Sequence, residues 1–173
     1  FDAVDVANYM AGEIENNLKS TQAQDIIRFS NQSYDMIPLY GTVQPYFLFY
    51  NAVKTDSFWD HKWQLSALFP SMGLSRRYHH VYRDKEIPYD VWSNIHFGVI
   101  GKYCRFSEDT LLVGADVAQI LDTWKDDPEE DKKAITVGCN LYENYTIKHV
   151  KINVNHLISK IIKYRLYYIN GEH

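Results

Sequence analysis

Cysteine is scarce in this chain of 173 residues, where Cys104 and Cys139 are the only two. Neither belongs to a CxxC or Cys/His spacing, and no HExxH or EF-hand pattern occurs, so we expect no metal and no cofactor. Two buried free thiols are favoured over a disulfide, which an oxidising compartment would permit. No apolar run approaches the roughly 18–20 residues of a membrane span, so no stable membrane insertion is expected.

Positive charge is not in excess either: the formal net charge is −4 and the sequence pI is about 6.0. A protein that grips a nucleic-acid backbone usually has a basic face, because neutralised phosphates release counterions. The negative net charge therefore counts against a nuclease, although a local basic patch would be enough to bind a nucleic acid. Aromatic residues, in contrast, make up 15% of the chain. They favour a large core, and Tyr and Trp also line sites for sugars, bases and partners.

The chain also lacks an initiating Met and the basic start of a signal peptide, since it opens with Phe1-Asp2-Ala3. We therefore expect a piece of a longer chain, secreted through its parent. Its length fits one domain of ordinary size.

Apolar spacing and capping residues predict a mainly α fold, a single compact domain of packed helices with irregular loops. Ser107 and Asp127 are strong N-caps, and Asp127-Pro128 with Glu130 forms a capping box. Residues 146–154 alternate more like a strand, so a small β element is expected there. Helices are expected over residues 2–19, 23–29, from Pro45 onward, 88–104, 108–124, 128–145 and 156–169.

The helix predicted to begin at Pro88 is apolar except for a few positions, among them Asp90 and Asn94, which share a face because they are four residues apart. A buried carboxylate beside an amide is costly unless both are hydrogen-bonded or line a cleft. Gly98 and Gly101 each weaken this helix by about 1 kcal/mol, which close packing of another backbone would explain.

A second polar intrusion into an apolar segment occupies residues 59–62, Trp-Asp-His-Lys. Asp60 and Lys62 are either an ion pair that stabilises the fold or groups with pKa values tuned for proton transfer. We expect Asp90 and Asn94 to line a cleft with Asp60 or Lys62. A carboxylate oxygen of one motif should then lie within about 8 Å of a group from the other.

His96 allows two interpretations, and neither is favoured. It follows Asp90 by six residues, and positions six apart lie about 120° from overlay on a helix. The two side chains converge only if the helix begins late after Pro88, with Asp90 in its first turn. Otherwise Asp90 is a helix cap, and His96 is a core histidine beside Trp92.

Two charged segments also allow more than one interpretation. Residues 76–83 interleave arginines with Tyr78, His79 and His80, which suits contact with RNA and supplies a general acid and base. An ordinary solvated loop is the favoured alternative. The acidic run 126–131 is most simply helix capping with a solvated face, and this is favoured over calcium binding.

Four stretches carry a recognisable order and spacing: residues 59–62 (WDHK), 89–98 (YDVWSNIHFG), 106–119 (FSEDTLLVGADVAQ) and 126–131 (DDPEED), the last continuing to Gly138 and Tyr142. In these stretches the chain resembles the bacterial polymorphic toxin type 44 family. The resemblance implies the C-terminal toxin domain of a secreted interbacterial effector. It also implies a parent chain from a type VI, type VII or Rhs-type system, and a cognate immunity protein that silences the toxin.

The resemblance divides the chain into three parts. Residues 46–145 are the expected type 44 toxin core, and residues 1–45 are a helical segment that is a delivery remnant or a family-variable part. Residues 146–173 are a variable tail helix. The immunity protein is expected to present an acidic surface to the basic segment 76–83.

Three functions remain open, of which the first is slightly favoured. The first is a hydrolase that attacks peptidoglycan or its lipid-linked precursor in the periplasm of a competing cell, with a carboxylate pair as acid and base. Tyr89-Asp90 with His96 is similar to part of the colicin M motif, which implies cleavage of that precursor, although Ile87 and Phe97 replace its remaining Asp and Arg.

The second function is a metal-independent RNase in the target cytoplasm, and the third is a non-enzymatic binding module. The candidate catalytic residues are Asp60, Lys62, Asp90, Asn94 and His96. The candidate substrate-binding residues are Trp59, Tyr89, Trp92, Arg76, His79, His80 and Gln119.

Overall fold

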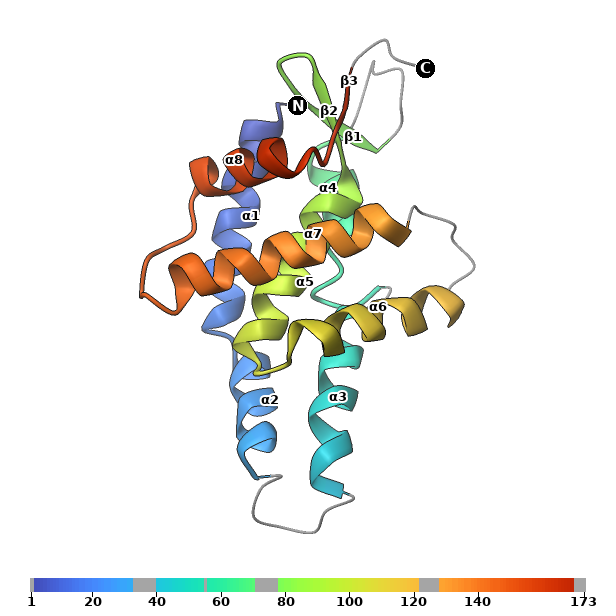
Figure 1. Ribbon diagram of the computed structural model, residues 1–173, viewed down its shortest axis with the longest axis vertical. Helices are drawn as coiled ribbons and strands as arrows, with labels where there is room; N and C mark the ends of the chain where they lie inside the picture. The colour runs from blue at the N-terminus through green and yellow to red at the C-terminus, as the bar shows by residue number, and fades with distance from the viewer. Residues whose placement is uncertain (1, 33–39, 55, 71–77, 122–127, 170–173) are drawn as a thin grey trace.

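The computed structural model describes residues 2–32, 40–54, 56–70, 78–121 and 128–169, and it confirms the mainly α fold (Figure 1). The elements, in chain order, are α1 (Ala3–Leu18), α2 (Thr21–Gln32), α3 (Tyr40–Val53), α4 (His61–Leu68), β1 (His79–Tyr82), β2 (Lys85–Pro88), α5 (Tyr89–Tyr103), α6 (Glu108–Leu121), α7 (Pro128–Leu141), the π-helix η1 (Tyr142–Thr146), α8 (Val154–Tyr164) and β3 (Tyr168–Ile169).

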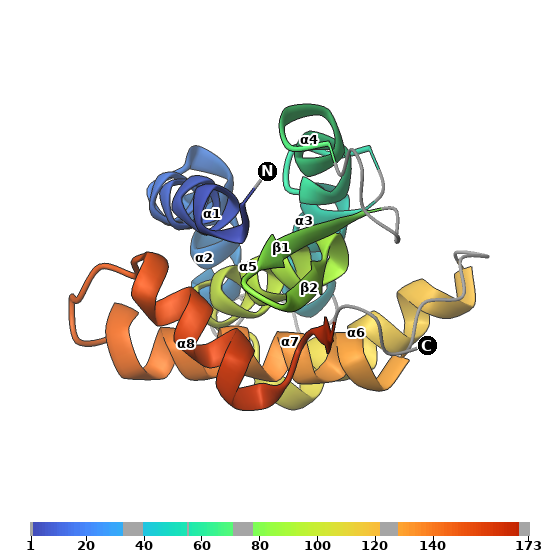
Figure 2. The same ribbon diagram turned by 90° about the horizontal axis from the view of Figure 1, so that it is seen from above.

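Helix α5 is the centre of the molecule. Seen from above, it lies between a layer of α6, α7 and α8 and a layer of α1 to α4 (Figure 2). One apolar cluster joins α5 to α1, α4, α7 and α8 through side chains such as Met10, Leu65 and Trp92. A second cluster joins α5 to α2, α3 and α6 through side chains such as Phe49 and Ile100. Burial on both sides explains why the helix is so apolar in sequence.

Helices α5 and α7 pack with their main chains in direct contact at two glycines. A Cβ added at Gly98 would overlap the carbonyl oxygen of Ile135, and one added at Gly138 would overlap the carbonyl oxygen of Ile95. The expectation that another backbone packs against Gly98 is therefore confirmed. At Gly101, in contrast, the neighbour is a side chain, that of Leu111.

Several helix boundaries follow the capping chemistry. Helix α5 begins directly after Pro88, and α7 begins at Pro128, as expected. The Ser107 hydroxyl accepts the backbone N–H of Thr110 at 3.1 Å, which confirms the N-cap of α6. Asp127, the expected cap of α7, lies outside the described residues.

Helix α3 begins earlier than the sequence indicated. It starts at Tyr40, so Pro45 lies inside the helix and not at its beginning. A proline there removes one N–H···O bond and crowds the preceding turn, which costs about 3 kcal/mol in an isolated helix. Burial of Pro45 and of Phe49, whose ring packs on Phe97 and Phe106, offsets that cost.

The β elements lie elsewhere than expected, and the strand predicted over residues 146–154 is wrong. The π-helix η1 continues α7 as far as Thr146, and the Asn153 side chain caps α8 in a capping box with His156. Since helical structure holds both ends of this segment, little of it is left to join a sheet. The sheet has the antiparallel order β1-β2-β3.

For the basic segment 76–83 a solvated loop was the favoured alternative, but its part from residue 79 onward belongs to a hairpin of residues 79–88, in which Val81 pairs with Glu86. Arg83 takes a left-handed conformation at its turn, with φ of 57°. Helix α8 ends at Tyr164, five residues before the predicted end, because Arg165 is also left-handed. The chain then adds β3 to β2.

Both thiols are free and buried, as predicted from the cysteine spacing. Burial raises the pKa of Cys104 and that of Cys139 to about 12, so neither is a reactive thiolate. Among the described residues, no helix is long and apolar enough to span a bilayer.

We expect Gly138→Ala to lower the free energy of unfolding by at least about 3 kcal/mol, because a methyl group there must push α5 and α7 apart. Gly12→Ala is the matched control, since nothing lies within 4 Å of a Cβ at that position in α1. The control should be neutral or stabilising by up to about 1 kcal/mol. Urea unfolding followed by circular dichroism measures both, and equal stabilities would contradict the backbone contact.

Candidate functional site

Two polar pairs, contributed by three helices, involve residues one turn apart along α5. The ammonium of Lys62, in the first turn of α4, lies 3.0 Å from Oδ1 of Asp90. One turn further along α5, Nδ2 of Asn94 donates to Oδ1 of Asp131 in α7 at 2.5 Å. Lys62 and Asp90 are 44% and 29% exposed, so solvent reaches them. We call Lys62, Asp90, Asn94 and Asp131 the polar cluster.

Sequence reasoning anticipated part of this cluster. The expected proximity between the 59–62 motif and Asp90 is present, because Lys62 forms an ion pair with it. Asp131 was missed as a site residue, since the acidic run around it reads as helix capping. The amide of Asn94 was the available signal, because a half-buried amide needs an acceptor from another element.

Asp60 has a different environment from Lys62. Its Oδ1 accepts the backbone N–H of Lys62 at 3.2 Å, and its Oδ2 accepts the backbone N–H of Asp56 at 3.1 Å. Asp60 is thus the N-cap of α4, and it fixes the turn from which the Lys62 side chain extends.

A pair of buried histidines lies beneath the first turn of α4. The ring centroids of His61 and His96 are 4.1 Å apart, and the edge of the Trp59 ring packs on His96. Glu13 Oε2 lies 3.2 Å from Nε2 of His61, and Asn17 Nδ2 lies 3.0 Å from Nε2 of His96. We call His61 and His96 the histidine pair.

Burial keeps His96 neutral. Desolvation is the main cause that lowers the pKa of His96 well below its ordinary value, and the neighbouring His61 adds to the effect. The neutral ring accepts the amide N–H of Asn17 at Nε2, which leaves its own proton on Nδ1. Its side chain is buried, and its contacts are those of a core histidine.

Several residues expected to bind substrate are also buried. The His80 ring stacks on Tyr89 at 4.4 Å, and both side chains donate to the carbonyl oxygen of Phe69. Desolvation lowers the pKa of His80 to about 4. Trp59 and Trp92 are core side chains as well.

The other expected substrate-binding residues lie in strand β1 or beyond the described part of the chain. His79, in β1, is partly buried and packs on the Tyr168 ring at 5.7 Å. Arg76 and the side chain of Gln119 lie outside the described residues, as does the neighbouring Arg77 of the basic segment.

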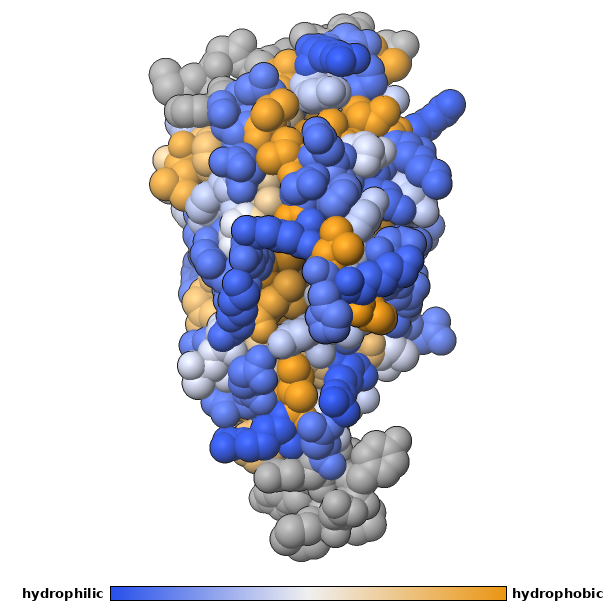
Figure 3. Space-filling model, turned by 90° about the vertical axis from the view of Figure 1, so that its left-hand side faces the viewer, coloured by the Kyte–Doolittle hydropathy of each residue, from blue (hydrophilic) through white to orange (hydrophobic). Residues whose placement is uncertain are grey.

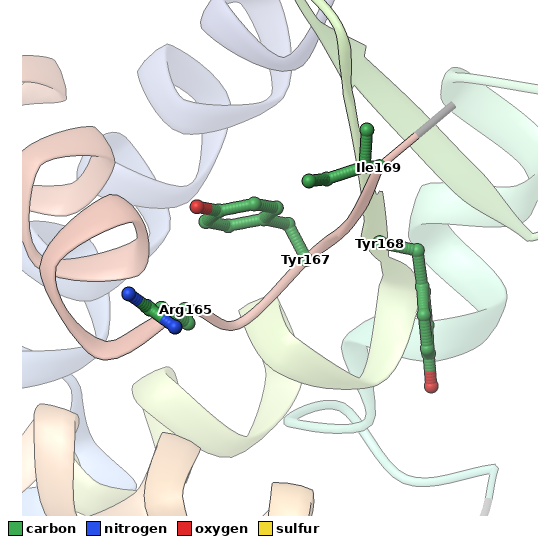
Figure 4. Close-up of a pocket in the computed structure, with 4 residues that line it drawn as sticks. All are labelled: Arg165, Tyr167, Tyr168 and Ile169. Carbon is green, nitrogen blue, oxygen red and sulfur yellow. The ribbon is translucent and has the colours of Figure 1, made fainter. Parts of the chain in front are cut away.

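Two recesses are lined by residues other than those of the polar cluster. One, of about 420 Å³, lies beside β3, where Arg165 and Tyr167 extend to one side of the chain and Tyr168 to the other (Figure 4). The other, of about 620 Å³, lies between α1 and the segment from Tyr142 to Ile152. On that face, hydrophobic side chains gather between hydrophilic ones (Figure 3). In the part of the chain that the structure describes, no three His, Cys, Asp or Glu side chains could hold a metal ion.

We expect the fold to lose stability as the pH falls below about 6.5, because the unfolded chain then protonates histidines that the fold keeps neutral. For His80, a pKa lowered from 6.5 to about 4 corresponds to roughly 3 kcal/mol, present above pH 6.5 and lost on descent towards pH 4. Urea unfolding at several pH values measures this slope. His80→Gln should flatten it, whereas His149→Asn, at an exposed left-handed position, should not. If the free energy of unfolding depends on pH equally in the parent and in both variants, His80 is not the source of this pH dependence.

Comparison with known proteins places this geometry in a family. The family model described as bacterial toxin 44 matches residues 48–144, which is more than half of the chain and includes the whole polar cluster. Glu13 and Asn17 lie outside the matched segment. Searches of curated proteins and of solved structures found no match. On the evidence of the family model, the chain belongs to the bacterial toxin 44 family.

Proposed function

We propose that this bacterial toxin domain is a hydrolase that attacks the cell envelope of a competing bacterium, at peptidoglycan or its lipid-linked precursor. The family supports a secreted effector that acts on other bacteria and that has an immunity partner. The observation that carries the proposal is the polar cluster, in which a solvent-exposed ion pair and an amide–carboxylate hydrogen bond involve residues one turn apart along α5.

The polar cluster suits hydrolysis of a glycosidic bond. Such enzymes use one carboxyl group as general acid and a second as base or nucleophile. We assign the base or nucleophile to Asp90, because the ammonium of Lys62 at 3.0 Å stabilises its negative charge. We assign the general acid to Asp131, because the neutral amide of Asn94 favours its ionised form less than the ammonium of Lys62 favours that of Asp90. Asn94, which shares a face of α5 with Asp90, donates a hydrogen bond to Asp131.

The competing RNase function has weaker support. A metal-independent RNase needs histidines that can exchange protons with a substrate near neutral pH. His80 and His96 are buried, and desolvation lowers both of their pKa values. The net charge of −4 also gives a polynucleotide little overall attraction. Among the described residues of the basic segment, His79 and Arg83 in the hairpin remain as candidates for that function.

We expect Asp90→Asn and Asp131→Asn each to reduce hydrolysis of purified peptidoglycan or of its lipid-linked precursor by about 10²- to 10⁴-fold, the usual contribution of a general acid or base. Release of soluble fragments measures the rate. Asp5→Asn is the control, since it removes an exposed carboxylate from the first turn of α1.

Circular dichroism and thermal unfolding verify that the variants remain folded. The proposal fails if both variants keep full activity. It also fails if the parent protein degrades RNA while leaving both envelope substrates intact. No activity on any of these substrates, together with tight binding of one of them, would favour a binding module.

A further inference from the structure

We propose that Glu13 and Asn17 of α1 are positioning residues that hold Lys62 against Asp90 by way of the histidine pair. The inference rests on the proposed function and adds two residues to its site. It extends the active unit of the toxin beyond residues 48–144, the segment that the family model matches.

The contacts of His61 explain why Glu13 controls its ring. A carboxylate only accepts hydrogen bonds, so the proton of His61 is on Nε2 and points at Glu13 Oε2, 3.2 Å away. The other ring nitrogen, Nδ1, is buried and has no hydrogen-bond partner among the described residues. Among the described residues, Glu13 therefore provides the one polar contact that orients this buried ring.

Asn17 performs the corresponding role for His96, one helical turn further along α1. Its amide Nδ2 lies 3.0 Å from Nε2 of His96, a ring that burial keeps neutral and able to accept. The two rings are in contact, with centroids 4.1 Å apart. A shift of either ring therefore displaces the other.

The histidine pair fixes the first turn of α4 on α5. His61 directly precedes Lys62, whose backbone N–H is held by the Asp60 cap. The same turn thus meets α5 at two points, His96 through the ring contact and Asp90 through the ion pair. Without the contacts from Glu13 and Asn17, the ring contact between His61 and His96 is no longer fixed. The ammonium of Lys62 then loses its defined position beside Asp90. Misplacement of a reacting group by about 1 Å can cost a hundredfold in rate.

The test compares Glu13→Ala with Glu15→Ala. Glu15 is on the same helix and pairs at the surface with Lys19 and Lys151, without touching the histidine pair. We expect Glu13→Ala to lower kcat on the envelope substrate by about ten- to hundredfold, with KM little changed. Glu15→Ala should retain the parent rate. Glu13→Gln should recover most of the loss, because the amide oxygen still accepts the Nε2 proton of His61.

Asn17→Ala gives a second comparison, which remains informative if Glu13→Ala does not fold. Its control is Asn16→Ala, at an exposed position next along the helix. We again expect a loss in kcat for Asn17→Ala, which removes a contact with the histidine pair, and none for Asn16→Ala. Thermal unfolding of all these variants separates a change in rate from a loss of folded protein.

A measurement without substrate tests the positioning of Lys62 separately from the proposed function. NMR signals of the lysine ammonium groups, with that of Lys62 assigned by Lys62→Arg, report its ion pair with Asp90. We expect Glu13→Ala to move this signal towards its position in Asp90→Asn, and Glu15→Ala to leave it in place.

An unchanged Lys62 signal in folded Glu13→Ala and Asn17→Ala would overturn the inference, whatever the substrate assays give. A moved signal with full kcat would also overturn it, because the contact would then be structural only. If the parent protein hydrolyses no envelope substrate, the proposed function fails, and the signal still decides whether α1 positions Lys62.

Discussion

The backbone contact between Gly98 in α5 and Gly138 in α7 is the constraint on which the rest of the structure depends. It sets a helix separation that any side chain larger than hydrogen would prevent. Asn94 lies one turn before Gly98, and Asp131 lies two turns before Gly138 on the facing helix. The hydrogen bond between Asn94 and Asp131 therefore forms one to two turns from the point of closest approach, and the separation set by the glycines helps to bring these two side chains within reach.

The other half of the polar cluster depends on the layer of α1 to α4, across α5 from α7 (Figure 2). There α4 supplies Lys62, and α1 supplies the polar groups that meet the buried histidine pair. A buried imidazole without a partner is costly, so the placement of two histidines here requires an external acceptor and donor. α1 also shares an apolar cluster with α5 and α8. The N-terminal helix is consequently part of the same folded unit as the segment that the family model matches.

The features that sequence predicted are those set by neighbouring residues. Pro88 and Ser107 specify helix starts through local capping, and the four-residue spacing of Asp90 and Asn94 fixes their shared face. Features set by distant residues were not predictable: Asp131 lies 37 positions from Asn94, and Glu13 lies 48 positions from His61. The two-residue strand β3 is too short to leave a pattern in sequence. The strand prediction for residues 146–154 was wrong because the alternation of apolar and polar residues there belongs to a turn and a helix cap, and not to a sheet.

The proposed target of the toxin is the cell envelope. The most direct measurement therefore compares the toxicity of the domain in the cytoplasm with its toxicity in the periplasm of one bacterial host. The domain is expressed once without a signal and once with a cleavable periplasmic signal, each beside its Asp90→Asn variant. The account predicts lysis and loss of labelled peptidoglycan only with the signal and only with Asp90 intact. Killing from the cytoplasm with degradation of RNA, independent of Asp90, would contradict it.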